Sequence, residues 1–227
     1  MFYYNDPTFL LLIPAMLLAL YAQFKVKSTF DKYSKVAASR GLTGAEVGRK
    51  LLDAAGLRSV PVQSVAGELT DHYDPRDKTL HLSQPVHDSN SVAAIGVVAH
   101  EVGHAIQDVQ SYAPLALRNN FVPVANLGSQ LAIPLFFLGI ILSYPLLMDI
   151  GIIAFSLAVA FQVITLPVEF NASSRAIKIL SDGGYLTSSE IPLAKSVLNA
   201  AALTYVAATA VAVLNLIRLL MLRGRRD

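Results

Sequence analysis

The sequence predicts a mainly α-helical integral membrane protein with about four transmembrane helices and a small α+β region. The first observation is composition, because 54% of the 227 residues are hydrophobic and 15% are charged, whereas about 25% charged residues are typical of soluble domains. The second is that four long stretches contain no charge. The third is that one segment has the turn residues and alternating pattern of a small mixed domain.

The four uncharged stretches are candidate membrane spans, since a helix crossing about 30 Å of hydrocarbon needs roughly 20 residues nearly free of charge. They are Pro7–Phe24, Asn119–Met148, Ile150–Val168 and Ser196–Ile217. Little more than Ser143-Tyr144-Pro145 and Asp149 separates the second from the third, so these two are expected to form a hairpin. The first lacks the basic start and small-residue cleavage site of a signal peptide, and we interpret it as a retained anchor.

These patterns divide the chain into five segments. They are an N-terminal transmembrane anchor (1–24), a small α+β region (25–118), a transmembrane hairpin (119–168), a helix with a connector (169–195), and a fourth transmembrane helix with a basic tail (196–227). Basic residues beside membrane spans stay preferentially in the cytoplasm.

Four lysines follow the first span, so we expect residues 25–118 to face the cytoplasm; these are Lys25, Lys27, Lys32 and Lys35. The tail would then lie outside, against the same rule, although it contains Arg218, Arg223, Arg225 and Arg226. A fourth segment that lies in the membrane interface, or that returns partway through the membrane, would remove this conflict.

The α+β region has recognisable helix and strand signals. Thr43 and Glu46 have the spacing of a capping box, which predicts a helix over Thr43–Ala55. Short strands are expected at Val60–Val65, Glu68–Tyr73 and Lys78–Ser83, and a second helix at Ser91–Gln110. We expect Lys78–Ser83 to be an edge strand that can pair with an extended peptide, with a purely structural hairpin as the alternative.

The second helix of this region contains the motif His100-Glu101-Val102-Gly103-His104. Histidines at i and i+4 project from one face of a helix and can bind a single metal ion, and Glu101 can then reach a metal-bound water as a general base. The chain has no cysteine, so any metal must be held by His, Asp or Glu. Two solvated histidines on a surface helix would fit badly with the apolar residues Val97–Ala99 before the motif.

A catalytic zinc normally takes three protein ligands, so a third must come from elsewhere in the chain. Glu169 is the main candidate, because a carboxylate at the end of an uncharged span is costly to desolvate unless it has a partner. Asp108 is better placed to accept a hydrogen bond from an imidazole N–H. Asp108 and His81 remain the alternative ligands.

Several segments resemble the YugP-type neutral zinc metallopeptidases, a family of bacterial membrane proteins. These are HEVGH, the later LPVEFNASSRA, the opening NDPTFLLLIPAML and the segment DHYDPRDKTLHLS. The family is distantly similar to the HtpX and CAAX-prenyl endopeptidases, in which H-E-x-x-H is followed by an E-x-x-x-D helix. The resemblance implies a gluzincin site with zinc bound by His100, His104 and Glu169, and with Glu101 as the catalytic base.

The position of the final aspartate of E-x-x-x-D is Ser173 in this chain. The function of that aspartate must therefore be supplied by another residue. Asn171 and Arg175 lie on the same predicted helix as Glu169 and could substitute for the aspartate.

We therefore expect a multi-pass inner-membrane zinc metalloendopeptidase with its active site on the cytoplasmic face. It would cleave membrane-associated proteins or peptides by Glu-assisted attack of zinc-bound water. The alternatives are a non-catalytic membrane scaffold with structural zinc and a zinc amidohydrolase acting on a non-peptide amide. The expected partners are the lipid bilayer and a peptide or membrane-protein substrate. A net charge of +2 argues against nucleic acid, and no pattern indicates an oligomeric state.

Overall fold

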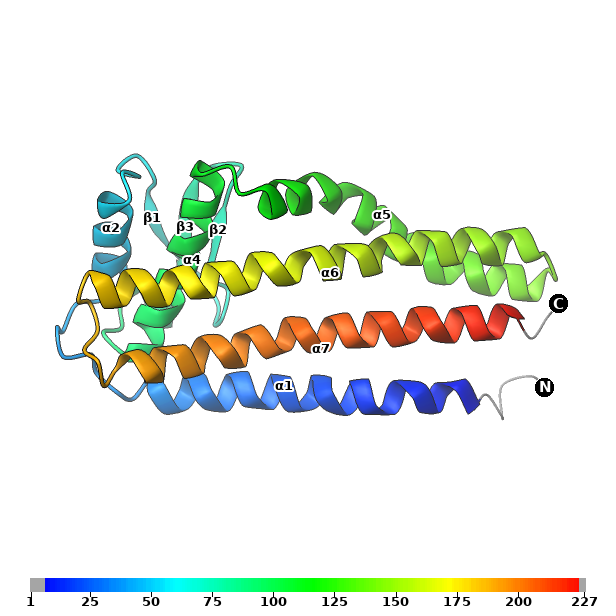
Figure 1. Ribbon diagram of the computed structural model, residues 1–227, viewed down its shortest axis with the longest axis horizontal. Helices are drawn as coiled ribbons and strands as arrows, with labels where there is room; N and C mark the ends of the chain where they lie inside the picture. The colour runs from blue at the N-terminus through cyan, green and yellow to red at the C-terminus, as the bar shows by residue number, and fades with distance from the viewer. Residues whose placement is uncertain (1–6, 225–227) are drawn as a thin grey trace. The chain divides into compact units, whose positions relative to one another are not determined.

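The computed structural model describes residues 7–224. Its elements, in chain order, are the short 3-10 helix η1 (Pro7–Leu11), α1 (Leu12–Tyr33), α2 (Gly44–Ala54), β1 (Val62–Val65), β2 (His72–Asp74), β3 (Thr79–Ser83), α3 (Gln84–His87), α4 (Val92–Val109), α5 (Ala113–Ile141), α6 (Pro145–Asp182) and α7 (Ile191–Gly224). The predicted fold class is confirmed, because four long apolar helices accompany one small three-stranded sheet (Figure 1).

The chain divides into two compact units. Unit 1 comprises Met1–Gln23, Ala116–Pro167 and Leu203–Asp227, and unit 2 comprises Phe24–Leu115 and Val168–Ala202. The ends of the predicted anchor and basic tail, residues 1–6 and 225–227 with Arg225 and Arg226, lie outside the described residues. The five segments expected from the sequence remain a prediction.

Among residues 7–224, four helices are long and apolar enough to cross a membrane: Thr8–Tyr33, Ala113–Ile141, Pro145–Asp182 and Ile191–Gly224. The predicted spans Ile150–Val168 and Ser196–Ile217 lie within the third and fourth of them, and Pro7–Phe24 begins one residue before the first and otherwise lies within it. The second span was predicted too long, because α5 ends at Ile141 and residues 145–148 already belong to α6. The hairpin turn therefore occupies residues 142–144, and Asp149 lies inside α6 rather than in the turn.

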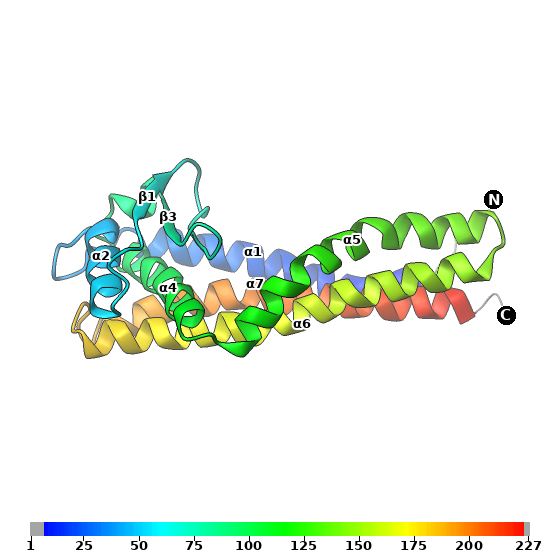
Figure 2. The ribbon, with the colours of Figure 1, turned by 90° about the horizontal axis from the view of Figure 1, so that it is seen from above.

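Within unit 1, α5 and α6 pack closely after this turn. A Cβ atom added to Gly151 of α6 would come within 2.8 Å of the backbone oxygen of Ala132 in α5, so a small residue is required there. Figure 2 shows α5 as a bent helix, and Pro123 and Pro134 in its interior account for a bend, since proline removes a helical hydrogen bond. Arg223 of α7 donates to Asp149 of α6 at 2.8 Å, which neutralises one basic residue at the end of the last helix.

Unit 2 contains the sheet, whose strand order is β1-β3-β2. β1 pairs with β3 in parallel, with Val62 opposite Leu80, and β2 pairs with β3 antiparallel, with Tyr73 opposite Leu80. The expectation that Lys78–Ser83 forms an edge strand is therefore wrong, because β3 is paired on both sides and the edges are β1 and β2. β2 is also shorter than predicted, since Ala66–Thr70 forms a turn closed by the hydroxyl of Thr70 donating to the carbonyl of Ala66 at 3.1 Å.

The core of unit 2 lies between the sheet and the helices α2 and α4. Leu80 and Leu82 of β3, Leu52 of α2, and Ile95 and Val98 of α4 are all fully buried. The predicted capping box begins α2, because Thr43 accepts from the Glu46 backbone and Glu46 accepts from the Thr43 backbone. Ser91 caps α4 in the same way by accepting from the Ala94 backbone N–H. These caps and contacts hold α4, with its HEVGH motif, in a fixed position in unit 2.

Candidate metal centre

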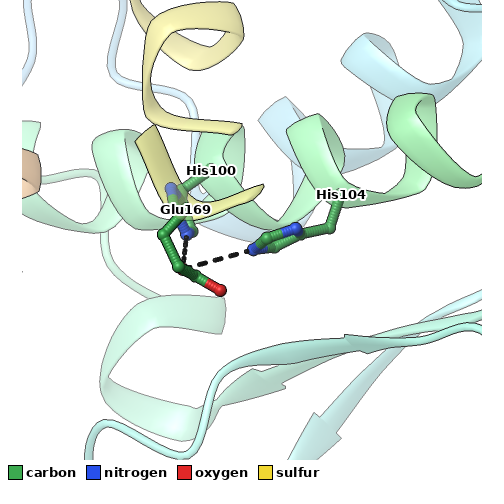
Figure 3. A group of neighbouring side chains, drawn as sticks. All are labelled: His100, His104 and Glu169. Carbon is green, nitrogen blue, oxygen red and sulfur yellow. Dashed lines mark hydrogen bonds and ion pairs between the residues drawn. The ribbon is translucent and has the colours of Figure 1, made fainter. Parts of the chain in front are cut away.

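Two histidines of α4 and one glutamate of α6 converge in unit 2. His100 and His104 project from the same side of α4 towards Glu169, as Figure 3 shows. The Nε2 atoms of His100 and His104 lie 3.3 Å and 3.6 Å from Oε2 of Glu169. One ligand atom from each of the three residues lies within 4.8 Å of the others. The structure thus brings together the three ligands expected from the sequence.

The donor set fits a zinc ion. Two imidazole nitrogens and one carboxylate oxygen are typical zinc ligands, and bonds of about 2.0–2.1 Å in a tetrahedron place ligand atoms about 3.3 Å apart. The distances from Oε2 of Glu169 to the two Nε2 atoms, 3.3 Å and 3.6 Å, are close to that value. Glu169 is only 3% exposed, and a carboxylate buried to that extent requires a charged or hydrogen-bonding partner.

Glu101 lies on the same helix and is held by the sheet. The backbone N–H of Tyr73, in the edge strand β2, donates to Oε2 of Glu101 at 3.1 Å. The other carboxylate oxygen, Oε1, accepts no hydrogen bond from residues 7–224. Burial raises the pKa of Glu101 above its ordinary value, which suits a group that must both accept and return a proton near neutral pH.

Each imidazole also has a partner for its outer nitrogen. Nδ1 of His100 lies 3.1 Å from the hydroxyl of Ser173, and Nδ1 of His104 lies 3.0 Å from Oε1 of Gln107. The expectation that Asn171 and Arg175 substitute for the missing aspartate at position 173 stays a prediction: Ser173 itself contacts His100, and Asn171 and Arg175 form hydrogen bonds beside Gln107. Gln107 was missed, and its position three residues after His104 on one helix face was the available signal.

The alternative ligands lie outside this group. Asp108 accepts hydrogen bonds from the Tyr73 hydroxyl at 2.8 Å and from Lys78 at 3.0 Å, so its predicted role as acceptor for an imidazole N–H is wrong. His81 stacks on His72 with ring centroids 4.7 Å apart, and its Nε2 lies 3.4 Å from Oδ2 of Asp77.

A glycine inside the motif lets α4 and α6 approach each other. A Cβ atom added to Gly103 would lie 2.8 Å from the backbone oxygen of Ala172 in α6. Ala172 is fully buried and lies three residues after Glu169. The close contact at Gly103 therefore sets the separation between the helix that carries the histidines and the helix that carries the glutamate.

Comparison with known proteins identifies the family. Residues 8–224 match the protein family described as “Putative neutral zinc metallopeptidase”. The chain belongs to this family. It is also 52% identical to “Putative membrane protease YugP” of Bacillus subtilis (strain 168) over 219 residues, which cover 96% of this chain and 97% of that protein. No solved structure matches.

Membership of this neutral zinc metallopeptidase family confirms the resemblance deduced from HEVGH and LPVEFNASSRA. The family implies zinc, for which His100, His104 and Glu169 form a suitable group. Together with the four apolar helices, the likeness to a membrane protease makes this chain a membrane protein. The metal ligands and the catalytic residue are assigned in the proposal below.

Proposed function

We propose that this protein is a membrane-embedded zinc metalloendopeptidase that hydrolyses peptide bonds of membrane-associated proteins or peptides. The observation that carries the proposal is that His100 and His104, on the helix that also carries Glu101, converge with the buried Glu169 of α6 to within 4.8 Å. His100 and His104 would hold the ion through Nε2, and Glu169 through Oε2. When bound, zinc supplies a Lewis acid that acidifies a water molecule and polarises the scissile carbonyl.

Glu101 is the general base in this proposal. Its Oε1 accepts a proton from the attacking water and then passes that proton to the nitrogen of the leaving amine, so the water is consumed and the C–N bond is broken. The Tyr73 N–H, bound to Oε2, keeps the carboxylate oriented while Oε1 acts. Because this N–H belongs to the edge strand β2, the orientation of Glu101 depends on the position of the sheet.

The arrangement of the ligands favours hydrolysis over a purely structural zinc. A structural site has four protein ligands, whereas a catalytic site leaves one position to water. Among residues 7–224 the group that could hold a metal has three members, and neither His81 nor Asp108 belongs to it. Hydrolysis of a non-peptide amide would use the same residues, so the preference for peptides comes from the family.

We place the site at the cytoplasmic surface of the inner membrane. α6 has 38 residues and is therefore about 57 Å long, well over the roughly 30 Å of bilayer hydrocarbon. Its uncharged part, Ile150–Val168, is long enough to cross, and Glu169 is the next residue. A metal site that begins where the span ends favours substrates held at the membrane, and the lysines after the first span favour the cytoplasmic side.

The substitution Glu101→Gln tests the proposed role of this residue. The amide has a similar shape but cannot accept the proton from water, so hydrolysis of a fluorogenic peptide library should fall by about 10²–10⁴-fold. Zinc content per folded protein should stay at the wild-type value, since Glu101 is not a ligand. Both quantities can be measured on protein reconstituted in lipid vesicles.

Glu68→Gln is the matched control, because Glu68 is an exposed carboxylate in a loop. This variant should keep wild-type activity and zinc. Wild-type turnover in metal-replete Glu101→Gln would reject the general-base role and favour a structural zinc. Cleavage of non-peptide amides without cleavage of any library peptide would favour the amidohydrolase instead.

A further inference from the structure

We propose that Gln107 is a positioning residue that fixes the orientation and the tautomer of His104 and joins it to the helix carrying Glu169. This inference rests on the proposed metal site. Gln107 is 0% exposed, and a buried amide is costly unless its polar atoms are paired. Every polar atom of its side chain has a partner, and all of these partners belong to or support the metal centre.

The hydrogen bonds of the Gln107 amide can be assigned from its neighbours. Its nitrogen, Nε2, donates to the backbone oxygen of Val168 at 2.9 Å and to Oδ1 of Asn171 at 2.9 Å. A backbone carbonyl can only accept, so the atom facing Val168 must be the NH₂ group. Oδ1 of Asn171 is fixed in turn, because Nε of Arg175 donates to it at 2.7 Å and can only donate.

This assignment determines the proton position on His104. Because the Gln107 nitrogen faces Val168 and Asn171, the carbonyl oxygen Oε1 must be the atom that faces Nδ1 of His104 at 3.0 Å. A carbonyl oxygen can only accept, so Nδ1 carries a proton, and in the neutral ring Nε2 then presents its lone pair. Nε2 is the atom that points at Glu169. The ring is therefore held in the tautomer and direction that a metal ligand needs.

The contacts of Gln107 also join the two ligand-bearing helices. Val168 directly precedes Glu169, so the amide ties His104 of α4 to the backbone beside the third ligand. Arg175 of α6 also donates to Oε1 of Gln110 in α4 at 2.6 Å, which is a separate bond between the two helices and contacts neither ligand. We infer that the site is preorganised by the protein before metal binds.

The outer nitrogen of His100 has a different kind of partner. Ser173 offers a hydroxyl, which can either donate or accept, so it is compatible with both tautomers of that ring. Gln107, whose amide orientation is fixed by a backbone carbonyl, specifies one tautomer only. This difference predicts that His104, rather than His100, is the ligand whose tautomer is set by the fold.

Gln107→Met tests the inference, because methionine fills a similar volume without hydrogen-bonding to His104, Val168 or Asn171. Loss of a partner that orients a metal ligand typically costs 10–100-fold in metal affinity. We expect zinc affinity, measured by competition with a chelator on the full-length protein in detergent, to fall by about that factor. In the zinc-free protein labelled with ¹⁵N-histidine, at a pH where the ring is neutral, the His104 ring should also lose its fixed Nδ1–H form and become a mixture of tautomers.

Gln110→Met is the matched control, since Gln110 lies on the same helix and also bonds across to α6, but to Arg175 and not to a ligand. It should leave zinc affinity and the His104 tautomer as in wild type. His104→Ala, the reference for a lost ligand, should abolish zinc binding. Gln107→Glu keeps the acceptor for Nδ1–H but loses the donor, so it should retain the His104 tautomer while weakening the link to α6.

The outcomes separate the two proposals. Unchanged zinc affinity in Gln107→Met together with zinc loss in His104→Ala would overturn the positioning role alone. An equal loss in Gln107→Met and Gln110→Met, with no change in the His104 tautomer, would also overturn it, because the effect would then come from general helix packing. Full zinc content in His104→Ala would overturn the proposed metal site itself.

Discussion

At the scale of single residues, both histidines of the candidate site are held at both ring nitrogens. His100 contacts Glu169 and Ser173, and His104 contacts Glu169 and Gln107. A ring held at two points cannot turn freely, so its ligand atom stays directed at the place where a metal would bind. Preorganisation of this kind reduces the entropy that ordering the side chains would otherwise cost on metal binding.

Residue chemistry made part of this site predictable. On a helix, H-E-x-x-H predicts two metal ligands on one face, and a carboxylate directly after an uncharged span needs a partner, which made Glu169 the main candidate for the third ligand. The roles of Ser173 and Gln107 could not be deduced in the same way. The contact of Ser173 with His100, and those of Gln107 with Val168 and Asn171, depend on how α4 and α6 are rotated against each other, and no spacing within one helix contains that information.

Glu190 provides a residue-scale prediction about pH. It is 7% exposed, and its carboxylate accepts from the backbone N–H and hydroxyl of Ser39, each at 2.7 Å, and from the backbone N–H of Thr187 at 2.7 Å. Burial alone would raise its pKa, but these hydrogen bonds outweigh burial and lower the pKa to about 2 from an ordinary value of 4.5. A folded-state pKa below the unfolded value stabilises the protein above the unfolded value.

We therefore expect Glu190→Gln to lower the melting temperature at pH 7, and to lower it less at pH 3. The stabilisation by the wild-type carboxylate is fully present above about pH 4.5 and is lost as the pH falls towards about 2. Thermal unfolding of both proteins in detergent at the two pH values measures this difference. If Glu190→Gln lowers the melting temperature by the same amount at both pH values, the charge of Glu190 does not contribute to stability.

At the scale of elements, the contact between α4 and α6 determines the geometry of the site. Gly103 lies where a Cβ would approach the Ala172 oxygen to 2.8 Å, so Gly103→Ala should push the two helices apart. Overpacking of this kind costs roughly 1–3 kcal/mol. We expect a lower melting temperature and weaker zinc binding, because Glu169 moves away from the imidazoles.

Gly96→Ala is the control for this prediction. The same change on the same helix would place a Cβ 3.4 Å from that of Ala194, an ordinary contact. It should leave zinc affinity unchanged and even stabilise α4, since alanine is favoured over glycine in helices by about 1 kcal/mol. If the two variants changed zinc affinity and melting temperature equally, the contact at Gly103 would not set the separation of α4 and α6.

The sheet shows which features of the elements the sequence could not predict. The capping box of α2 and the N-cap of α4 were predictable, because caps are local patterns. The strand order β1-β3-β2 was not predictable. It requires Val62–Val65 to pair in parallel with Leu80–Ser83, although β2 lies between these two segments in the sequence. Three short strands look alike in sequence, and nothing local indicates which of them will be central.

At the scale of the whole molecule, the spacing of charges was sufficient to find four membrane helices. It could not give their ends, because α1 and α6 continue as helices through charged residues such as Lys25, Asp149 and Glu169. Helix ends depend on capping and packing, whereas an uncharged stretch marks only the part that hydrocarbon can cover.

The orientation in the membrane can be tested with single cysteines, because the natural chain has none. Ser64 is an exposed residue of β1, and Tyr144 is 50% exposed in the turn between α5 and α6. If residues 25–118 face the cytoplasm, a membrane-impermeant thiol reagent on intact cells should label Tyr144→Cys and not Ser64→Cys. The opposite pattern would reverse the proposed orientation.

The central claim is that His100, His104 and Glu169 bind one catalytic zinc, and zinc content per folded protein tests it most directly. Wild type should contain one zinc, and Asp108→Ala should contain the same amount, because Asp108 bonds only to Tyr73 and Lys78. Glu169→Ala should lose zinc, and Glu169→Asp, shorter by one methylene, should keep part of it. Full stoichiometric zinc with unchanged affinity in Glu169→Ala would contradict the ligand assignment.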